Sequence, residues 1–298
     1  MVTVYALAAA LLYGSADFLG GVATRRARAL SILPASALAG LVIVLAAALA
    51  SGGSASGTGL AWGLAAGAVG GIGLIVFYAG LAEGPMTIVA PTSALTATVL
   101  PVTVSFAGGE RASATVYLGA LICLVAVAMV SAAGSPAEGD AADRSSRTRS
   151  LAHRLSRRGF HVRPIGYGLA AGAAFGLFFI FLRNAGQSGA FWPIVASRLG
   201  GFLIIVIAAA ATRTRPVVAS GGTRLLVATF GSGILDASAN VAYVVATRAG
   251  LFGLAVVLTS LYPGVTVVLA RFVLGERLRM VQLAGLLLAA AGVILVTI

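Results

Sequence analysis

The chain has 298 residues, of which 59% are hydrophobic and 9% are charged, and its formal net charge is +12. A soluble domain carries about 25% charged residues. So few charges cannot cover a water-facing globule, and we expect a multi-pass membrane protein. The basic residues sit in short clusters between apolar runs, which excludes a nucleic-acid-binding surface. The single cysteine, Cys123, permits no intrachain disulfide and no cysteine metal cluster, so we expect no metal and no cofactor.

Apolar runs that are long enough to cross a bilayer recur along the whole chain. A bilayer core requires about 20 apolar residues per helix. The sequence therefore predicts an all-α membrane protein with ten transmembrane helices. Their expected ranges are 2–22, 32–51, 59–81, 86–107, 114–133, 165–183, 190–212, 223–246, 251–272 and 280–298.

The arginines indicate how these helices are oriented. All twenty basic residues are arginines; sixteen lie in the connections after the odd-numbered helices, and three lie in the connections on the other face. Positively charged residues favour the cytoplasmic side of a membrane. We therefore predict a protein of the cytoplasmic membrane with both termini outside. The charged loop 134–164 is then cytoplasmic, either as a solvated linker or as a short basic helix on anionic lipid.

The second half of the chain repeats the first. Three segments align in order: Tyr5–Gly14 with Tyr167–Gly176, Ser36–Gly40 with Ser197–Gly201, and Gly109–Arg111 with Gly275–Arg277. We predict two five-helix repeats, 1–133 and 165–298, joined by the linker 134–164. Because five is odd, the second repeat crosses the membrane in the opposite direction. Inverted repeats of this kind are an architecture of secondary transporters.

Three stretches resemble the EamA-type domain of the drug/metabolite transporter superfamily. They are the opening YGSADF, the in-helix arginine of IVASRLGGFLI, and the turn and final helix of LARFVLGERLRMVQLAGLLLAAAGVILV. The resemblance covers nearly the whole chain in two copies. It implies ten helices, transport of small metabolites with export favoured, and a cavity lined by the first four helices of each half. The first half departs from the pattern, because Ala37 and Ala97 stand where the second half has Arg198 and Pro263.

Prolines mark two helices that we expect to bend. Pro91 and Pro101 fall inside the run 86–107, and Pro263 falls inside the run 251–272. Each proline removes a backbone hydrogen bond, and the freed carbonyls need protein or water partners in a membrane. The hydroxyls beside these prolines either form a polar wall along the substrate path or bond back to their own helix. They belong to Thr92, Ser93, Thr96, Ser260 and Tyr262.

Two carboxylates and one guanidinium lie inside predicted helices, at Asp17, Asp236 and Arg198. A carboxylate at a helix centre costs about 2.5–3.5 kcal/mol on insertion, so each should face a partner or a wet cavity. Arg198 and Asp236 fall at similar depth, and we predict that they pair. Our hypothesis is that Asp17 or Asp236 binds a proton or the cationic part of a substrate; the alternative is a fixed Asp–Arg bridge. Asn240 and Tyr243 share a helical face with Asp236 and add donors for a polar solute.

These patterns predict a secondary active transporter that moves a small metabolite or drug-like solute by alternating access. We expect export, with proton coupling as a further hypothesis. The expected partners are a small-molecule substrate, membrane lipid and, if transport is coupled, the proton; the oligomeric state is left open. The alternative is a facilitative channel or an uptake carrier for a small polar solute. An enzyme is not expected, because the predicted helices contain no histidine and no clustered acidic residues.

Overall fold

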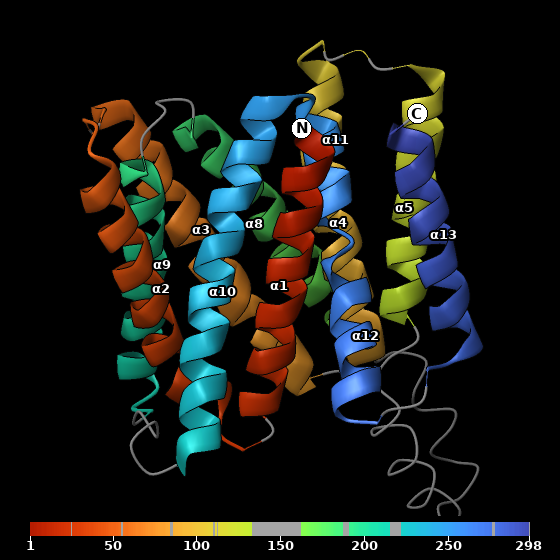
Figure 1. The fold of residues 1–298 in the computed structure, drawn as a ribbon. Coiled ribbons are helices and arrows are strands. Elements are labelled where there is room, and N and C mark those ends of the chain that lie inside the picture. Colours follow the sequence, from red (N-terminus) through yellow and green to blue (C-terminus); the bar gives the residue numbers. More distant parts are fainter. Residues whose placement is uncertain are drawn as a thin grey trace, which may run out of the picture.

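The computed structural model describes residues 1–24, 26–54, 56–83, 86–109, 111, 113–132, 162–186, 191–214, 222–275 and 278–297. Every regular element within these ranges is an α-helix, as expected (Figure 1). Seven spans of this part of the chain are long and apolar enough to cross a membrane. Three further apolar helices have shorter described stretches, at Thr92–Ala107, Ala114–Val130 and Met280–Leu295. The expectation of a helical membrane protein is confirmed.

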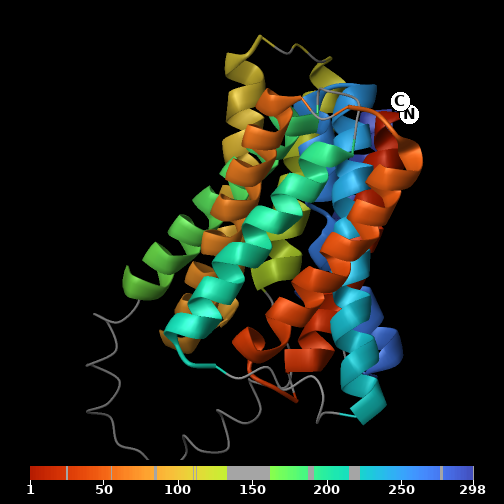
Figure 2. The ribbon, with the colours of Figure 1, turned by 90° about the vertical axis from the view of Figure 1, so that its left-hand side faces the viewer.

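The helices of the first half are α1 (Val2–Thr24), α2 (Ala29–Ser51), α3 (Gly57–Glu83), α4 (Met86–Ala107) and α5 (Ala114–Ala132). Those of the second half are α8 (Val162–Gly186), α9 (Trp192–Ala211), α10 (Gly222–Ala249), α11 (Phe252–Thr259), α12 (Tyr262–Val273) and α13 (Met280–Thr297). Helices α1 and α8 run in opposite directions, and the N- and C-termini lie at the same end of the molecule (Figures 1 and 2). We call this the terminal end.

The end away from the termini carries most of the described arginines and is called the arginine-rich end. These residues lie where α1, α9 and α12 end and where α8, α10 and α13 begin: Arg26, Arg28, Arg163, Arg213, Arg224, Arg271 and Arg279. The structure does not describe residues 133–161, so the predicted linker 134–164 and its cytoplasmic placement lie almost entirely outside the described ranges. Helix α8 begins at Val162, three residues before the expected boundary.

One expected helix is two. The run 251–272 forms one apolar span, Phe252–Val273, but its helix is interrupted at Ser260 and Leu261 into α11 and α12, so the expected bend is a break. The Ser260 amide still donates to the Val256 carbonyl (2.9 Å), and the Gly264 amide donates to the Leu261 carbonyl (2.9 Å). Pro263 lies in the first turn of α12, where a missing N–H costs nothing. In contrast, α4 runs as one helix past Pro91 and Pro101.

Contacts between the halves come in corresponding pairs. The repeat relates α1, α2 and α3 to α8, α9 and α10. The contact of α1 with α10 therefore corresponds to that of α8 with α3, and the contact of α2 with α10 corresponds to that of α9 with α3. Helix α4 packs on α8, as α11 and α12 pack on α1. The fifth helices, α5 and α13, pack on each other at one side of the molecule (Figure 1).

Glycines allow two of these pairs to approach closely. A Cβ atom at Gly67 would lie 2.7 Å from the carbonyl carbon of Ser197, on α9. A Cβ atom at Gly233 would lie 2.7 Å from the carbonyl carbon of Ser36, on α2. The two contacts correspond, because Ser36 aligns with Ser197 in the sequence repeat. Absent side chains of this kind are what permits backbone contact between membrane helices.

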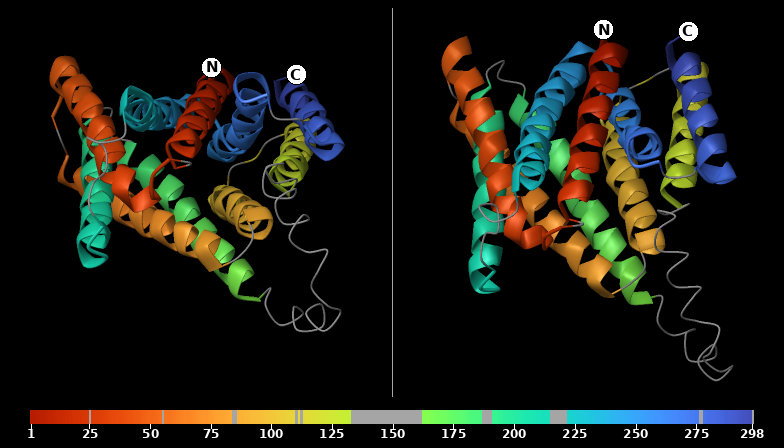
Figure 3. Two further views of the ribbon diagram at one scale, coloured as in Figure 1. Left: turned by 90° about the horizontal axis from the view of Figure 1, so that it is seen from below. Right: turned by 60° about the horizontal axis from the view of Figure 1, so that its bottom comes forward.

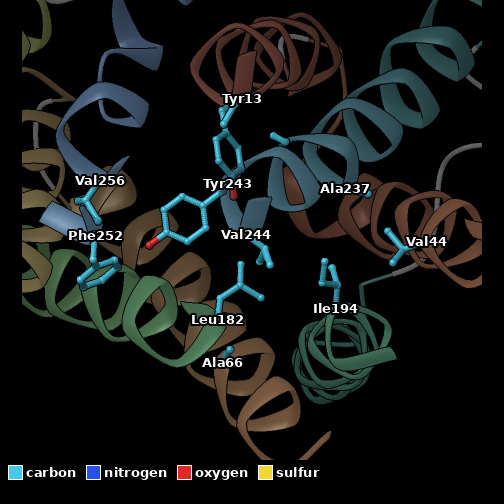
Figure 4. Packing of buried hydrophobic residues seen from close by; sticks show 12 residues of the cluster. Tyr13, Val44, Ala66, Leu182, Ile194, Ala237, Tyr243, Val244, Phe252 and Val256 are labelled. Carbon is cyan, nitrogen blue, oxygen red and sulfur yellow. The ribbon is translucent and has the colours of Figure 1, made fainter. Parts of the chain in front are cut away.

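A hydrophobic cluster joins the helices towards the terminal end. It brings Leu182 of α8 against Val244 of α10 and Phe252 of α11, with Ile194 of α9 beside them (Figure 4). The Arg183 guanidinium lies over the Phe252 ring, 4.3 Å from its centroid. The two sides of the molecule are therefore packed together at the terminal end.

Candidate functional site

Asp17 lies between the two sides of the helix bundle. Seen from the arginine-rich end, α10, α1 and α12 follow one side, and α3, α8 and α4 follow the other (Figure 3). The Asp17 carboxylate on α1 is within electrostatic range of Asp236 on α10, of Tyr262 on α12 and of Tyr78 on α3. Because groups on both sides surround it, Asp17 faces the interior of the bundle. It is nevertheless solvent-exposed, so water has access to it there.

The predicted partner of Asp236 is in place. Arg198 of α9 forms an ion pair with the Asp236 carboxylate on α10, and its second terminal nitrogen donates to the Asp236 backbone carbonyl (2.8 Å). The Arg198 side chain is 13% exposed and that of Asp236 is 41% exposed. The guanidinium is thus held on the protein side of the pair, while the carboxylate retains access to water.

Hydrogen bonds extend this pair towards the terminal end. Asn240 lies one turn beyond Asp236 and donates its amide to the Asp236 carbonyl (2.9 Å). Its side-chain oxygen accepts a hydrogen bond from the Tyr13 hydroxyl on α1. Tyr13, Asp17, Arg198, Asp236 and Asn240 make up the central polar cluster, which unites α1, α9 and α10.

Aromatic rings border the central polar cluster. Tyr13 meets Phe179 of α8 edge to face, with ring centroids 6.1 Å apart, and meets Tyr262 of α12 at 6.2 Å. The Phe179 ring also contacts Phe178, at 5.2 Å, and Tyr243, at 4.8 Å. The Tyr243 hydroxyl does not face the cluster, because it donates to the Phe179 carbonyl (3.1 Å).

The predicted hydroxyl wall is only partly assembled at this place. Tyr262 lies beside the cluster, whereas the Thr96 and Ser260 hydroxyls donate to carbonyls of their own helices, those of Thr92 (2.8 Å) and Val257 (2.7 Å). Ser93 is buried where α4 packs on α8. Thr92 is packed at the same interface, because a Cβ at Gly168 would lie 2.8 Å from its Cβ. The structure therefore supports the back-bonding alternative for Thr96 and Ser260.

Sequence reasoning missed three residues of the site: Tyr13, Tyr78 and Phe179. From sequence alone, an aromatic residue within an apolar run is expected to face lipid or to be buried in the protein core. Tyr13 carried one usable signal, because it lies four residues before Asp17 and therefore on the same helical face. Tyr78 and Phe179 are brought to the cluster by packing between helices, which no local pattern encodes.

Among the described residues, no group of three or more His, Cys, Asp or Glu side chains could hold a metal ion. Cys123 is buried. A Cβ at Gly292 would lie 2.6 Å from its sulfur, so Cys123 fills a contact between α5 and α13. The chemistry available at the cluster is therefore that of carboxylate, guanidinium, amide and phenol groups: ion pairing, hydrogen bonding and proton exchange.

Comparison with known proteins agrees with this architecture. Residues 163–298 match the EamA-like transporter family. The second half of the chain is therefore similar to that family. The EamA-like family is one of membrane transporters in the drug/metabolite transporter superfamily, so the resemblance seen in the sequence is confirmed for residues 163–298. It is not a family of enzymes.

The fold is also found among solved structures. The fold of this chain is similar to that of a solved structure titled "Crystal structure of protein", with a TM-score of 0.75 and 18% sequence identity. The similarity covers 99% of this chain and 96% of that chain. No curated protein matches the sequence. Both halves of the chain thus share the fold of that solved structure.

Proposed function

We propose that the chain is a secondary transporter that moves a small metabolite or drug-like solute across the cytoplasmic membrane by alternating access. The observation that carries the proposal is the water-accessible Asp17 carboxylate between two sides of a membrane helix bundle. A charge is maintained at such a place where it faces a solute or ion pathway. The central polar cluster is the binding site in this proposal.

The proposed architecture is ten spans in two inverted five-helix repeats, 1–133 and 165–298. Three observations support it: the opposite directions of α1 and α8, the corresponding contacts between the halves, and the matched backbone approaches at Gly67 and Gly233. Two equivalent halves can exchange conformations, so that the site opens first to one face of the membrane and then to the other.

We place the arginine-rich end in the cytoplasm and both termini outside, because positive residues are retained on the cytoplasmic side. The packed cluster around Leu182 and Val244 closes the terminal end. Towards the other end, Asp17 and Gly21 of α1 are exposed. This conformation then accepts a solute from the cytoplasm, which suits the export that the family resemblance favours.

We assign proton binding to Asp17. Asp236 is already engaged by Arg198, whereas Asp17 has no hydrogen bond or ion pair with any described residue. The groups that face Asp17 are Asp236 and the phenols of Tyr13, Tyr78 and Tyr262. Protonation removes the charge of Asp17, so a proton and a positively charged solute compete for it. Entry of a proton from outside then releases the solute, which is antiport.

A pair of engineered disulfides tests alternating access without knowledge of the solute. In a Cys123→Ala background, Gly186→Cys with Val244→Cys links α8 to α10 at the terminal end. A Cβ at Gly186 would lie 3.5 Å from that of Val244, within the range of about 3.5–4.5 Å that a disulfide needs. The repeat relates this pair to Thr24 and Tyr78 on α1 and α3. Thr24→Cys with Tyr78→Cys should therefore link when the arginine-rich end closes.

Alternating access predicts that each disulfide forms in its own double variant and that both do not form together in the quadruple variant. Mass spectrometry after mild oxidation in membranes measures the products. A terminal-end disulfide alone would indicate a static protein and would overturn the proposal. Efficient formation of both in one molecule would equally overturn it, because the two ends would then close independently.

A further inference from the structure

The central polar cluster belongs to one of two corresponding places in the molecule. The repeat aligns Gly14 with Gly176 and Ser36 with Ser197, and the contacts of Gly67 and Gly233 align α3 with α10. Each polar residue of the cluster then has a counterpart in the other half. The counterparts of Tyr13, Asp17, Arg198, Asp236 and Asn240 are Phe175, Phe179, Ala37, Gly70 and Leu74.

All five counterparts are apolar. The polar groups therefore gather on α1, α9 and α10, and aromatic rings gather on α3 and α8. Phe175 contacts Phe77 of α3, with ring centroids 6.3 Å apart. Phe178 covers Gly70, where a Cβ would lie 2.8 Å from its ring, so the ring occupies the place that corresponds to the surroundings of Asp236. A solute between the two sides would therefore meet charged groups on one side only, and phenylalanine rings on the other.

The charge of the polar side is negative. Arg198 is satisfied by the carboxylate and the carbonyl of Asp236, so the Asp17 charge is not compensated by any described residue. An anion would be repelled, and a neutral solute would leave the carboxylate without a partner when water is displaced. A cation removes that cost, and aromatic rings, such as those of Tyr13, Tyr262 and Phe179 that pack together beside the cluster, favour a cation near them.

We propose that the solute is a monovalent organic cation with an aromatic or apolar body. Its charged end lies at Asp17, and its body lies against Phe175, Phe178 and Phe77 of the opposite side. The inference rests on the proposed function, because it names the substrate class of the same site. The one-sided placement of polar and aromatic residues also means that the cation binds in one orientation.

Equilibrium dialysis with the purified full-length protein in detergent tests this assignment. The probes are benzyltrimethylammonium, which cannot lose its charge, tetramethylammonium, which lacks the ring, and phenylacetate, which reverses the charge. We expect benzyltrimethylammonium to bind at least 10-fold more tightly than either of the others. Equal or tighter binding of phenylacetate would overturn the charge assignment, and equal binding of tetramethylammonium would overturn the aromatic side.

Variants locate the binding. Asp17→Asn should weaken benzyltrimethylammonium binding at least 10-fold, and Phe175→Leu should weaken it several-fold. Phe181→Leu is the matched control, because Phe181 is also on α8 but stacks on Trp62, at 5.2 Å. Its affinity should equal that of the unmodified protein. An unchanged affinity of Asp17→Asn would refute the inference. If each engineered disulfide forms in its own double variant, the two do not form together in the quadruple variant, and no cation binds, then alternating access stands and the substrate class alone is wrong.

Discussion

At the scale of single residues, the two in-helix carboxylates are held in different ways. Asp236 is paired with Arg198, and Asp17 faces water and phenols. The pair is itself unequal, because its guanidinium is 13% exposed and its carboxylate is 41% exposed. Loss of one partner therefore has a cost that depends on which charge is left behind.

Asp236→Ala should destabilise the protein more than Arg198→Ala. Removal of Asp236 strands a largely buried guanidinium, which costs about 1–3 kcal/mol as an unsatisfied charged group. Removal of Arg198 leaves a carboxylate that water already reaches, so its cost is smaller. Thermal unfolding in detergent measures both. The double variant Arg198→Met/Asp236→Ala should recover much of the loss. A larger loss of stability in Arg198→Ala than in Asp236→Ala would show instead that the unpaired carboxylate is the costlier charge to leave in the protein.

At the scale of helices, the tightest contacts are between backbones. Gly67 lets α3 reach α9, and Gly233 lets α10 reach α2. A carbonyl cannot rotate away as a side chain can, so an added methyl group at either glycine must separate two helices. The backbone partners of these glycines, Ser197 and Ser36, are residues that the sequence repeat aligns.

Gly67→Ala and Gly233→Ala should therefore each lower stability by about 1–3 kcal/mol or more, as overpacking does. Gly166→Ala on α8 is the matched control, because a Cβ at Gly166 meets nothing within 4 Å. There, alanine should stabilise the helix by about 0.5–1 kcal/mol. Melting temperatures of the three variants in one detergent provide the comparison. A tolerated Gly67→Ala would mean that α3 and α9 are less closely packed than described.

Helix positions could be predicted from the sequence far better than the site. Runs of apolar residues are a strong signal, and the starts of α1, α4, α5 and α13 fall at the expected residues. The break at Ser260 and Leu261 was not predicted, because Pro263 is equally compatible with a kinked helix. The Arg198–Asp236 ion pair could be predicted, because the two residues fall at similar depth in their predicted transmembrane helices. The gathering of aromatic rings on α3 and α8 could not be predicted, because in the sequence Phe175, Phe178 and Phe77 resemble any other phenylalanines of an apolar helix.

At the scale of the whole molecule, access to Asp17 couples the site to the state of the two ends. The terminal end is packed around Leu182, Val244 and Phe252, and Asp17 is exposed on the other side of that packing. A proton that reaches Asp17 from outside must therefore wait for the conformational change. This sequence of events turns competition for one carboxylate into exchange of a proton for a cation across the membrane.

Proteoliposomes test this coupling. With benzyltrimethylammonium on the cytoplasmic side, acid on the opposite side should accelerate its export, since protonation of Asp17 releases the cation there and deprotonation on the cytoplasmic side restores binding. Asp17→Asn should abolish the effect of the pH gradient, because an amide takes up no proton in this range. Asp236→Asn should lower the rate and keep the pH dependence, since Asp17 remains. If Asp17→Asn retains the pH dependence and Asp236→Asn loses it, the proton is carried by Asp236, and Asp17 is a solute contact alone.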